Sequence, residues 1–177
     1  MTAAELPRSE FQRQLDVRQA EGKQMALVAT EEECRALARR FGLVRIDRLE
    51  AALDLSRTGA GVDANGRLSA EIVQTCAVSG EDLPVTIDEP LQFRFVAAQA
   101  AKAPGLELEI DVEDCDEIEF SGSVINLGEA VAQSLALAID PFAVGPNAEA
   151  VRREAGLGDE GAAGPFAALA ALKPKNL

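Results

Sequence analysis

A run of carboxylates in the second half of the chain is the densest group of side chains that could carry chemistry. No lysine or arginine occurs between Lys102 and Arg152. If the run forms a strand, alternate residues lie on one side of it, where like charges repel unless solvent or a cation screens them. Such a surface could dock a basic protein and steer its approach, or it could be a solvated edge that discourages strand aggregation. The candidate partner-binding residues are Glu107, Glu109, Asp111, Glu113, Asp116, Glu117 and Glu119.

Two other uses of these carboxylates fit the sequence less well. A calcium-binding EF-hand loop starting at Asp111 would need glycine at its sixth position and glutamate at its twelfth, where the chain has Asp116 and Gly122. A glycosidase uses one specific carboxylate pair, and no aromatic platform singles out two carboxylates here, because the chain has no tryptophan or tyrosine. A carboxylate-based hydrolase is therefore the least favoured function.

The composition removes most other catalytic machinery. The chain has no histidine, which excludes Ser-His-Asp and Cys-His nucleophiles and the common histidine zinc sites. We therefore expect no enzymatic activity, no cofactor and no metal. The formal charge of −13, from 30 acidic and 17 basic residues, argues against a surface that broadly neutralises phosphates. It fits a basic partner, or simply a well-solvated protein.

The cysteines are read together with the expected compartment. The N-terminal residues lack the apolar core of a signal peptide, and no apolar run approaches the roughly 20 residues that span a bilayer, so we expect a cytoplasmic protein with no membrane partner. Three distant cysteines in that compartment do not suggest disulfides. Cys76 alternates in phase with Ile72, and Cys34 lies on the apolar stripe of a predicted helix, so both are expected to be buried core thiols. Cys115 lies among carboxylates that disfavour its thiolate.

A small group of arginines is the one candidate for phosphate contact. Arg35 and Arg39 are neighbours four residues apart on the first predicted helix. Together with Arg40 they are the candidate RNA contacts, and Arg45 and Arg48 follow in the sequence. The alternative is that these arginines only offset the acidic residues before them and the helix dipole.

The first predicted helix, which would position these arginines, has clear ends. Thr30 and Glu33 have the spacing of a capping box, and Gly42 supplies a C-terminal stop. The apolar residues between them recur at helical spacing and predict a single buried stripe, which consists of Cys34, Leu37, Ala38 and Phe41.

Alternating apolar residues predict several strands. The Asn65-Gly66 pair predicts a type I′ hairpin turn, because both central residues of that turn need a positive φ. This many alternating runs implies a largely antiparallel, possibly barrel-like sheet with one buried face. The predicted strands cover residues 11–17, 24–29, 43–55, 68–76 and 91–95, with at least one more within 110–120.

A second predicted helix begins near Asn126, has Glu129 at capping-box spacing, and is stopped by Pro141. Two helices packed on such a sheet make an α+β domain, to which we assign residues 1–145. We expect residues 146–177 to be a tether rich in glycine, alanine and acidic residues with a short apolar hook, which docks either on its own domain or on a partner. The expected inner face of the helix consists of Ala130, Val131, Ser134, Leu135 and Ala138, widened by Leu127, Leu137 and Ile139, and the hook residues are Phe166, Leu169 and Leu172.

From about Ala70 to Leu172 the chain resembles the YceD family of large ribosomal RNA subunit accumulation proteins. The resemblance lies in the order and spacing of four short segments. They are the strand that ends at Cys76, the strand Leu91-Gln92-Phe93-Arg94-Phe95, the helix start Ile125-Asn126-Leu127-Gly128-Glu129, and the tail Pro165-Phe166-Ala167-Ala168-Leu169.

The resemblance implies a non-enzymatic role in large-subunit assembly or in the stability of its RNA. Many family members carry a Cys-x-x-Cys pair, but this chain has Ser79 where the cysteine after Cys76 would fall, so a zinc or redox role is not carried over. Family members tend to be encoded beside a small, basic large-subunit protein, which implies a basic ribosomal protein as partner, with ribosomal RNA or a pre-ribosomal particle as a further possibility. A thiol or metal-binding module is the alternative function.

Overall fold

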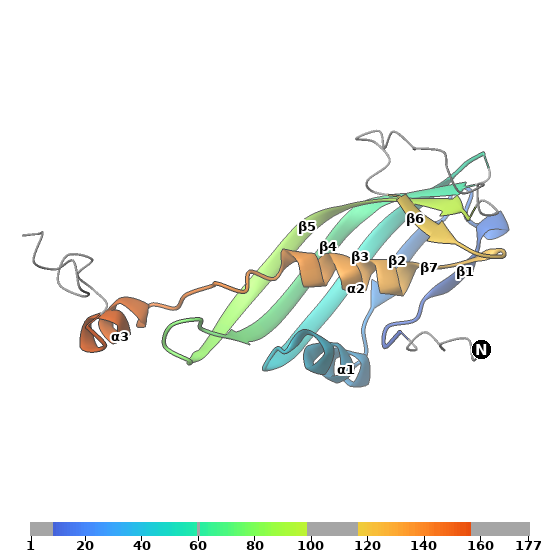
Figure 1. Ribbon diagram of the computed structural model, residues 1–177. Coiled ribbons are helices and arrows are strands. Elements are labelled where there is room, and N and C mark those ends of the chain that lie inside the picture. Colours follow the sequence, from blue (N-terminus) through green and yellow to red (C-terminus); the bar gives the residue numbers. More distant parts are fainter. Residues whose placement is uncertain (1–8, 60, 99–116, 157–177) are drawn as a thin grey trace, which may run out of the picture.

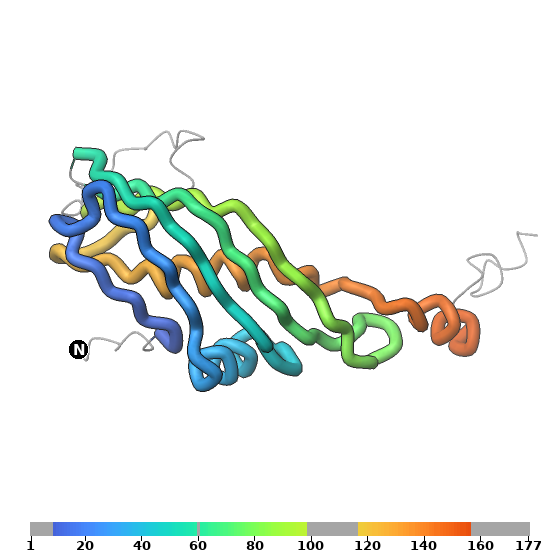
Figure 2. The backbone as a smooth tube through the Cα atoms, turned by 180° about the vertical axis from the view of Figure 1, so that it is seen from behind, coloured from blue at the N-terminus to red at the C-terminus, as the bar shows by residue number. Residues whose placement is uncertain are grey.

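Three long antiparallel strands form the centre of the computed structural model, which describes residues 9–59, 61–98 and 117–156 (Figures 1 and 2). They are β3 (Arg45–Thr58), β4 (Gly61–Thr75) and β5 (Asp82–Ala97). β2 (Gln24–Val28) pairs antiparallel with β3, and β6 (Glu117–Phe120) pairs parallel with β5. The strand order is β2-β3-β4-β5-β6, and β2 and β6 are not paired in the described part of the chain. The sheet is therefore mixed and open rather than barrel-like.

A small second sheet directly precedes helix α2 (Leu127–Ala138). It consists of β1 (Gln14–Asp16), antiparallel to β7 (Val124–Asn126). The strand predicted over residues 11–17 is thus only three residues long. It ends because the carboxylate of Asp16 accepts a hydrogen bond from the backbone N–H of Arg18 and starts a short 3₁₀ turn, η1 (Val17–Gln19).

Helix α1 (Glu31–Phe41) confirms the predicted ends. The Thr30 hydroxyl accepts from the backbone N–H of Glu33 at 3.3 Å, and the Glu33 carboxylate accepts from the Thr30 N–H at 2.8 Å. Gly42 follows in the left-handed conformation, with a φ of 67°. Cys34, Leu37 and Ala38 are buried, while Phe41 is half-buried.

Helix α2 (Leu127–Ala138) begins where predicted, but with half of the expected capping box. The Asn126 side chain accepts from the backbone N–H of Glu129, whereas the Glu129 carboxylate binds Arg40 of α1. The prediction for Leu137 was wrong, because this side chain is 88% exposed. It follows the buried Leu135 by two residues, which is about 200° around the helix.

Both helices cover the same face of the large sheet, which confirms an α+β fold (Figure 1). Their buried side chains and the inward side chains of β2 to β6 form one apolar cluster. The opposite face is polar and open, with cross-strand rows such as Glu50, Ser69 and Asp88. Among the described helices, none is long and apolar enough to cross a membrane.

The hairpin predicted at Asn65-Gly66 was wrong. These residues lie inside β4, where Asn65 is paired with Asp54 and Gly66 with Leu53. The chain reverses seven residues earlier, at Gly59, whose φ is 61°. Gly66 is instead a point of close strand contact, because a Cβ there would overlap the carbonyl oxygen of Ala52.

The segment after residue 145, predicted to be a tether, contains a short helix, α3 (Ala148–Glu154). Its first residue, Ala148, is buried. The predicted hook residues Phe166, Leu169 and Leu172 lie outside the described part of the chain.

Replacing Gly66 by alanine tests this position. We expect Gly66→Ala to lower the free energy of unfolding by about 2–4 kcal/mol, because the new methyl group meets backbone that cannot easily move. Asn65→Thr is the control: it should be neutral within about 0.5 kcal/mol in a strand, whereas a β-branched residue would be clearly unfavourable in a type I′ turn. Urea unfolding measures both, and a large loss in Asn65→Thr would contradict the register.

Candidate functional site

The structure describes two of the seven candidate partner-binding carboxylates. Glu117 and Glu119 lie on β6, are exposed, and alternate with Ile118 and Phe120, which face the core. β6 therefore presents its acidic side to solvent next to β5. The other five, Glu107, Glu109, Asp111, Glu113 and Asp116, lie outside the described residues.

Acidic residues greatly outnumber basic ones throughout the described residues that follow β4. In residues 76–98 and 117–151 there are nine acidic residues, and the one basic residue is Arg94. Arg94 donates to the carboxylate of Asp63 at 3.3 Å. Six of the nine acids form no ion pair within the described chain, and we call them the acidic surface: Glu81, Asp82, Glu89, Glu117, Glu119 and Asp140.

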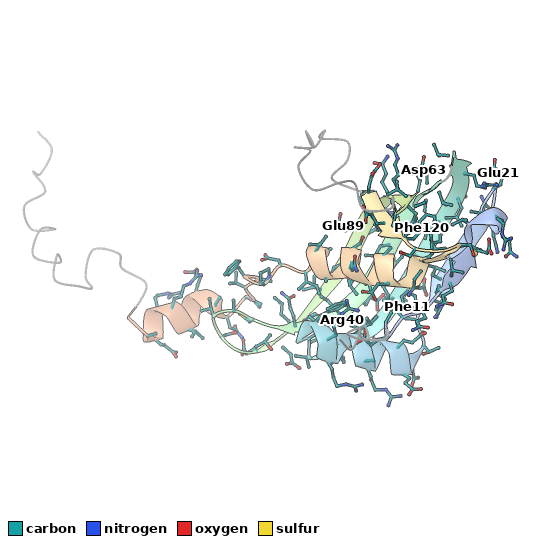
Figure 3. The ribbon with its side chains drawn as sticks, turned by 45° about the vertical axis from the view of Figure 1, so that its right-hand side comes forward. Phe11, Glu21, Arg40, Asp63, Glu89 and Phe120 are labelled. Atoms are coloured by element: carbon teal, nitrogen blue, oxygen red, sulfur yellow. The ribbon has the colours of Figure 1, made fainter. Side chains whose placement is uncertain are left out.

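The candidate RNA contacts do not form one cluster. Arg40 lies between the two helices, where it pairs with Glu129 of α2 at 2.7 Å and with Glu10 at 3.0 Å (Figure 3). These bonds raise the pKa of Arg40, and a phosphate would have to displace a carboxylate to reach it. Arg35 and Arg39 are exposed, and neither forms an ion pair with a described residue.

The two arginines that follow in the sequence are also used within the fold. Arg45 pairs with Asp47 at 2.9 Å. Arg48 pairs with Glu71 at 2.9 Å and with Glu50 at 3.1 Å. Two exposed arginines of the original group, Arg35 and Arg39, are therefore left as candidates.

Arg13, which the sequence analysis missed, connects three elements, β2, α1 and α2. Its guanidinium donates to both oxygens of Glu33 on α1, at 2.7 and 2.9 Å, and to the carbonyl oxygen of Val28 at 2.7 Å. It also lies 4.4 Å from the centroid of the Phe11 ring. Its backbone carbonyl accepts from Leu127, the first residue of α2. No local pattern could have revealed this role, because the partners are distant in sequence.

The hydrogen bond from Arg13 lowers the pKa of Glu33 to about 2, although partial burial acts in the opposite direction.

The thiol of Cys76 also has a lowered pKa. Cys76 is buried, as predicted, but its sulfur lies in a polar site at the end of β4 rather than in the apolar cluster. The backbone N–H groups of Gly145 and Ser79 donate to it at 3.2 and 3.3 Å. These bonds, that of Gly145 foremost, lower the pKa of Cys76 to about 6.

The other cysteines and possible metal ligands add no further site. Cys34 is buried, and burial raises the pKa of its thiol. Cys115 lies outside the described residues. Within the part of the chain that the structure covers, no group of three histidine, cysteine or acidic side chains could hold a metal ion.

The segment between α2 and α3, residues 139–147, is fixed to the turn between β4 and β5, and we call it the connector. The Gln74 side chain donates to the carbonyl oxygen of Asp140 at 2.9 Å, and the Ala77 N–H donates to that of Ala143 at 3.0 Å. Asn147 donates to the Glu81 carboxylate at 3.0 Å. The connector therefore holds Phe142, which is 80% exposed, in a defined place.

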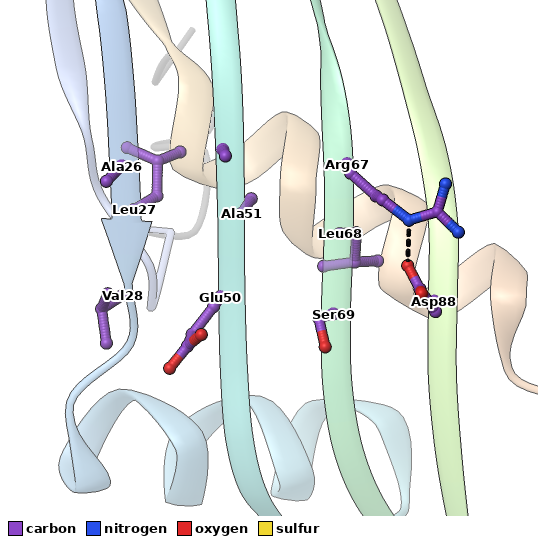
Figure 4. Close-up of a pocket in the computed structure, with 10 residues that line it drawn as sticks. Ala26, Leu27, Val28, Glu50, Ala51, Arg67, Leu68, Ser69 and Asp88 are labelled. Atoms are coloured by element: carbon purple, nitrogen blue, oxygen red, sulfur yellow. Dashed lines mark hydrogen bonds and ion pairs between the residues drawn. The ribbon is translucent and has the colours of Figure 1, made fainter.

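The open face of the sheet carries a shallow hollow of about 350 Å³ (Figure 4). Small residues of three neighbouring strands, Ala26, Ala52 and Ser69, leave this space. An ion pair between Arg67 and Asp88 lies at its rim. The other polar side chains of its lining are Glu50 and Ser69.

The comparison with known protein families gives a match over much of the chain. The model of the family described as large ribosomal RNA subunit accumulation protein YceD matches residues 64–173, which is more than half of the chain. The chain belongs to the YceD family. Neither the curated proteins nor the solved structures include a match.

The YceD match contains the elements described above. It spans most of β4, all of β5 and β6, helix α2, the connector and α3. It therefore includes the acidic surface and Cys76, but neither Arg13 nor α1. The description of the family is that of an accumulation factor for the large ribosomal RNA subunit, which is the general function indicated for this chain.

The pair of Arg13 and Glu33 should make stability depend on pH. Because the folded pKa of Glu33 is about 2, below its ordinary value of about 4.3, the pair stabilises the fold above pH 4.3 and loses this effect as the pH falls towards 2. We expect Arg13→Gln to cost roughly 1–2 kcal/mol at pH 7 and less at pH 2.5. Urea unfolding at several pH values measures this. Arg18→Gln, which breaks an exposed pair with Asp16, should change the stability much less, and an equal loss in both variants would contradict the role of Arg13.

The Cys76 thiol should ionise near pH 6 rather than near 8.5. Thiolate absorbance at 240 nm, followed from pH 4 to 10, should show this transition in the wild type and lack it in Cys76→Ser. Because the folded pKa is the lower one, folding stability gained from the thiolate is complete above pH 8.5 and lost as the pH falls through 6. A single transition near pH 8.5 or above would show that the Gly145 and Ser79 amides do not stabilise the thiolate.

Proposed function

We propose that this chain promotes accumulation of the large-subunit ribosomal RNA by binding a basic protein of the large subunit. It holds that protein in the cytosol until assembly and thereby suppresses its contacts with wrong RNA. The acidic surface is the observation that carries this proposal. Six carboxylates without an ion-pair partner in the described chain face solvent in the part that matches the family, and within residues 76–98 and 117–151 of that part Arg94 is the one basic residue.

Electrostatic attraction is the physical reason why the acidic surface would bind a basic protein. Unpaired carboxylates at a surface attract a basic protein over about 10 Å at moderate salt and speed its encounter. The same charges repel RNA phosphates, so this side of the molecule does not suit direct RNA binding. The five other candidate carboxylates, Glu107, Glu109, Asp111, Glu113 and Asp116, precede Glu117 in the sequence and add to the negative charge of this part of the chain.

A direct RNA contact is a second candidate role, and it rests on α1. Arg35 and Arg39 are exposed neighbours on this helix and form no ion pair with a described residue. α1 lies outside the family match, so this contact would be a property of the individual chain. In this arrangement the protein bridges a basic protein and ribosomal RNA. Residues 1–145 form the binding domain, and residues 146–177 carry the hook, which adds a second point of attachment.

Purification of the tagged full-length protein from its own cells, with and without nuclease, tests the proposed function. A basic large-subunit protein that stays bound after nuclease treatment is the expected result. Recovery of pre-ribosomal particles that are lost with nuclease, and of no basic protein, would favour the arginine helix instead. Recovery of neither at low salt would contradict the proposal.

Charge reversal then tests the surface. Glu117→Lys with Glu119→Lys should weaken binding of the recovered basic protein by about tenfold. Glu32→Lys with Asp54→Lys changes the net charge equally at exposed positions away from β6, and it should leave the affinity within about twofold. Arg35→Glu with Arg39→Glu should weaken association with particles but not with the isolated protein. Equal losses in the first two variants would show that only net charge matters.

A further inference from the structure

Two large apolar side chains protrude from the acidic side of the molecule. Leu137 at the end of α2 is 88% exposed, and Phe142 in the connector is 80% exposed. Single exposed apolar residues are common on soluble proteins and need no explanation. These two differ because they lie within six residues of each other and because the backbone around Phe142 is held in place.

The support of Phe142 comes from the buried core. Gln74 is the one polar residue buried in the described chain, with 6% exposure, and its amide donates to the carbonyl oxygen of Asp140. The Asp140 carboxylate in turn accepts from the Phe142 N–H at 2.8 Å. On the other side, the Ala143 carbonyl accepts from Ala77. Since this backbone is already ordered, a partner that contacts Phe142 loses little conformational entropy in the protein.

Leu137 borders a groove of about 260 Å³ between α2 and the sheet. Its lining combines apolar side chains with the carboxylate-bearing strand β6. The residues that line it are Gln92, Phe93, Glu117, Ile118, Ala130, Gln133, Ser134 and Leu137.

The charges around these residues indicate the class of partner. Glu117 lines the groove, and Asp140 lies between Leu137 and Phe142 in the chain. Both belong to the acidic surface. An RNA phosphate would meet carboxylates here, whereas a lysine or arginine beside an apolar side chain would be complementary.

We propose that the α2–β6 groove, Leu137 and Phe142 dock a basic protein segment that carries large apolar side chains. The apolar side chains of the segment contact Leu137 and Phe142, and its lysines or arginines face Glu117 and Asp140. This inference rests on the proposed function, because it assigns the apolar anchor of the same partner. Hydrophobic anchors at the centre of an interface supply most of the affinity, while rim charges mainly supply speed and specificity.

The edge of the sheet indicates how the segment binds. β6 pairs with residues 94–97 of β5, so the preceding part of β5 has no strand on its outer side within the described chain. Pro84 and Pro90 interrupt that part, and proline cannot donate a hydrogen bond to an added strand. The segment is therefore held by its side chains rather than by extension of the sheet.

Serine substitutions in the full-length protein test the proposal. The first probe is the mixture of proteins extracted with lithium chloride from purified large subunits. The basic protein that binds from this mixture is then purified, and its affinity for each variant is measured. Leu137→Ser and Phe142→Ser should each weaken its binding at least tenfold, with an unchanged melting temperature because both side chains are exposed. Val124→Ser removes a 44%-exposed valine on β7 and should change nothing.

The outcomes separate this inference from the proposed function. If both serine variants bind like the wild type while Glu117→Lys with Glu119→Lys weakens binding, the electrostatic function stands and the apolar anchor is wrong. If no extracted protein binds the wild type, both fail. If removal of residues 157–177 increases binding and Phe142→Ser alters the NMR signals of Phe166, the groove holds the chain's own hook, which overturns the proposal. A dimer that Phe142→Ser dissociates would overturn it in favour of a second copy.

Discussion

The need to cover one face of three long strands determines the rest of this structure. Strands of 14 to 16 residues extend about 50 Å, whereas the 12 residues of α2 extend about 18 Å. One helix cannot shield such a face, so α1 covers a second part of it. The two helices must then be fixed to each other, and the pair of Arg40 with Glu129 provides that link.

The use of arginine within the fold explains the uneven surface charge. Arg13 and Arg40 each join elements that are distant in the sequence, Arg48 joins the neighbouring strands β3 and β4, and all three pair with carboxylates. Most of the described basic side chains in the N-terminal half are therefore neutralised by ion pairs within the fold. The acidic residues after β4 have few such partners. The six residues of the acidic surface lie within the part of the chain that matches the YceD family.

Patterns of residues close in sequence predicted most helices and strands correctly. They could not predict contacts between residues that are distant in the sequence. The capping box at Thr30, the alternation of β3 and the helix start at Asn126 depend on residues close in sequence, and the structure confirms them. Asn65-Gly66 was misread because a dipeptide cannot show whether a hairpin or a close strand contact requires its glycine. The role of Arg13 and the support of Phe142 by Gln74 depend on partners 15 to 114 residues away, which no local pattern reveals.

The position of α2 in the chain has a consequence for synthesis. Four of the five strands of the large sheet have been made once β5 ends at Ala97, but Leu135 of α2 follows 38 residues later. At roughly 5–20 residues per second, the ribosome needs about 2–8 s to add that stretch. During this interval Phe93 and Phe95 are exposed beside a growing chain. The order of the elements therefore leaves the apolar face of the sheet without its covering helix α2 for several seconds of synthesis.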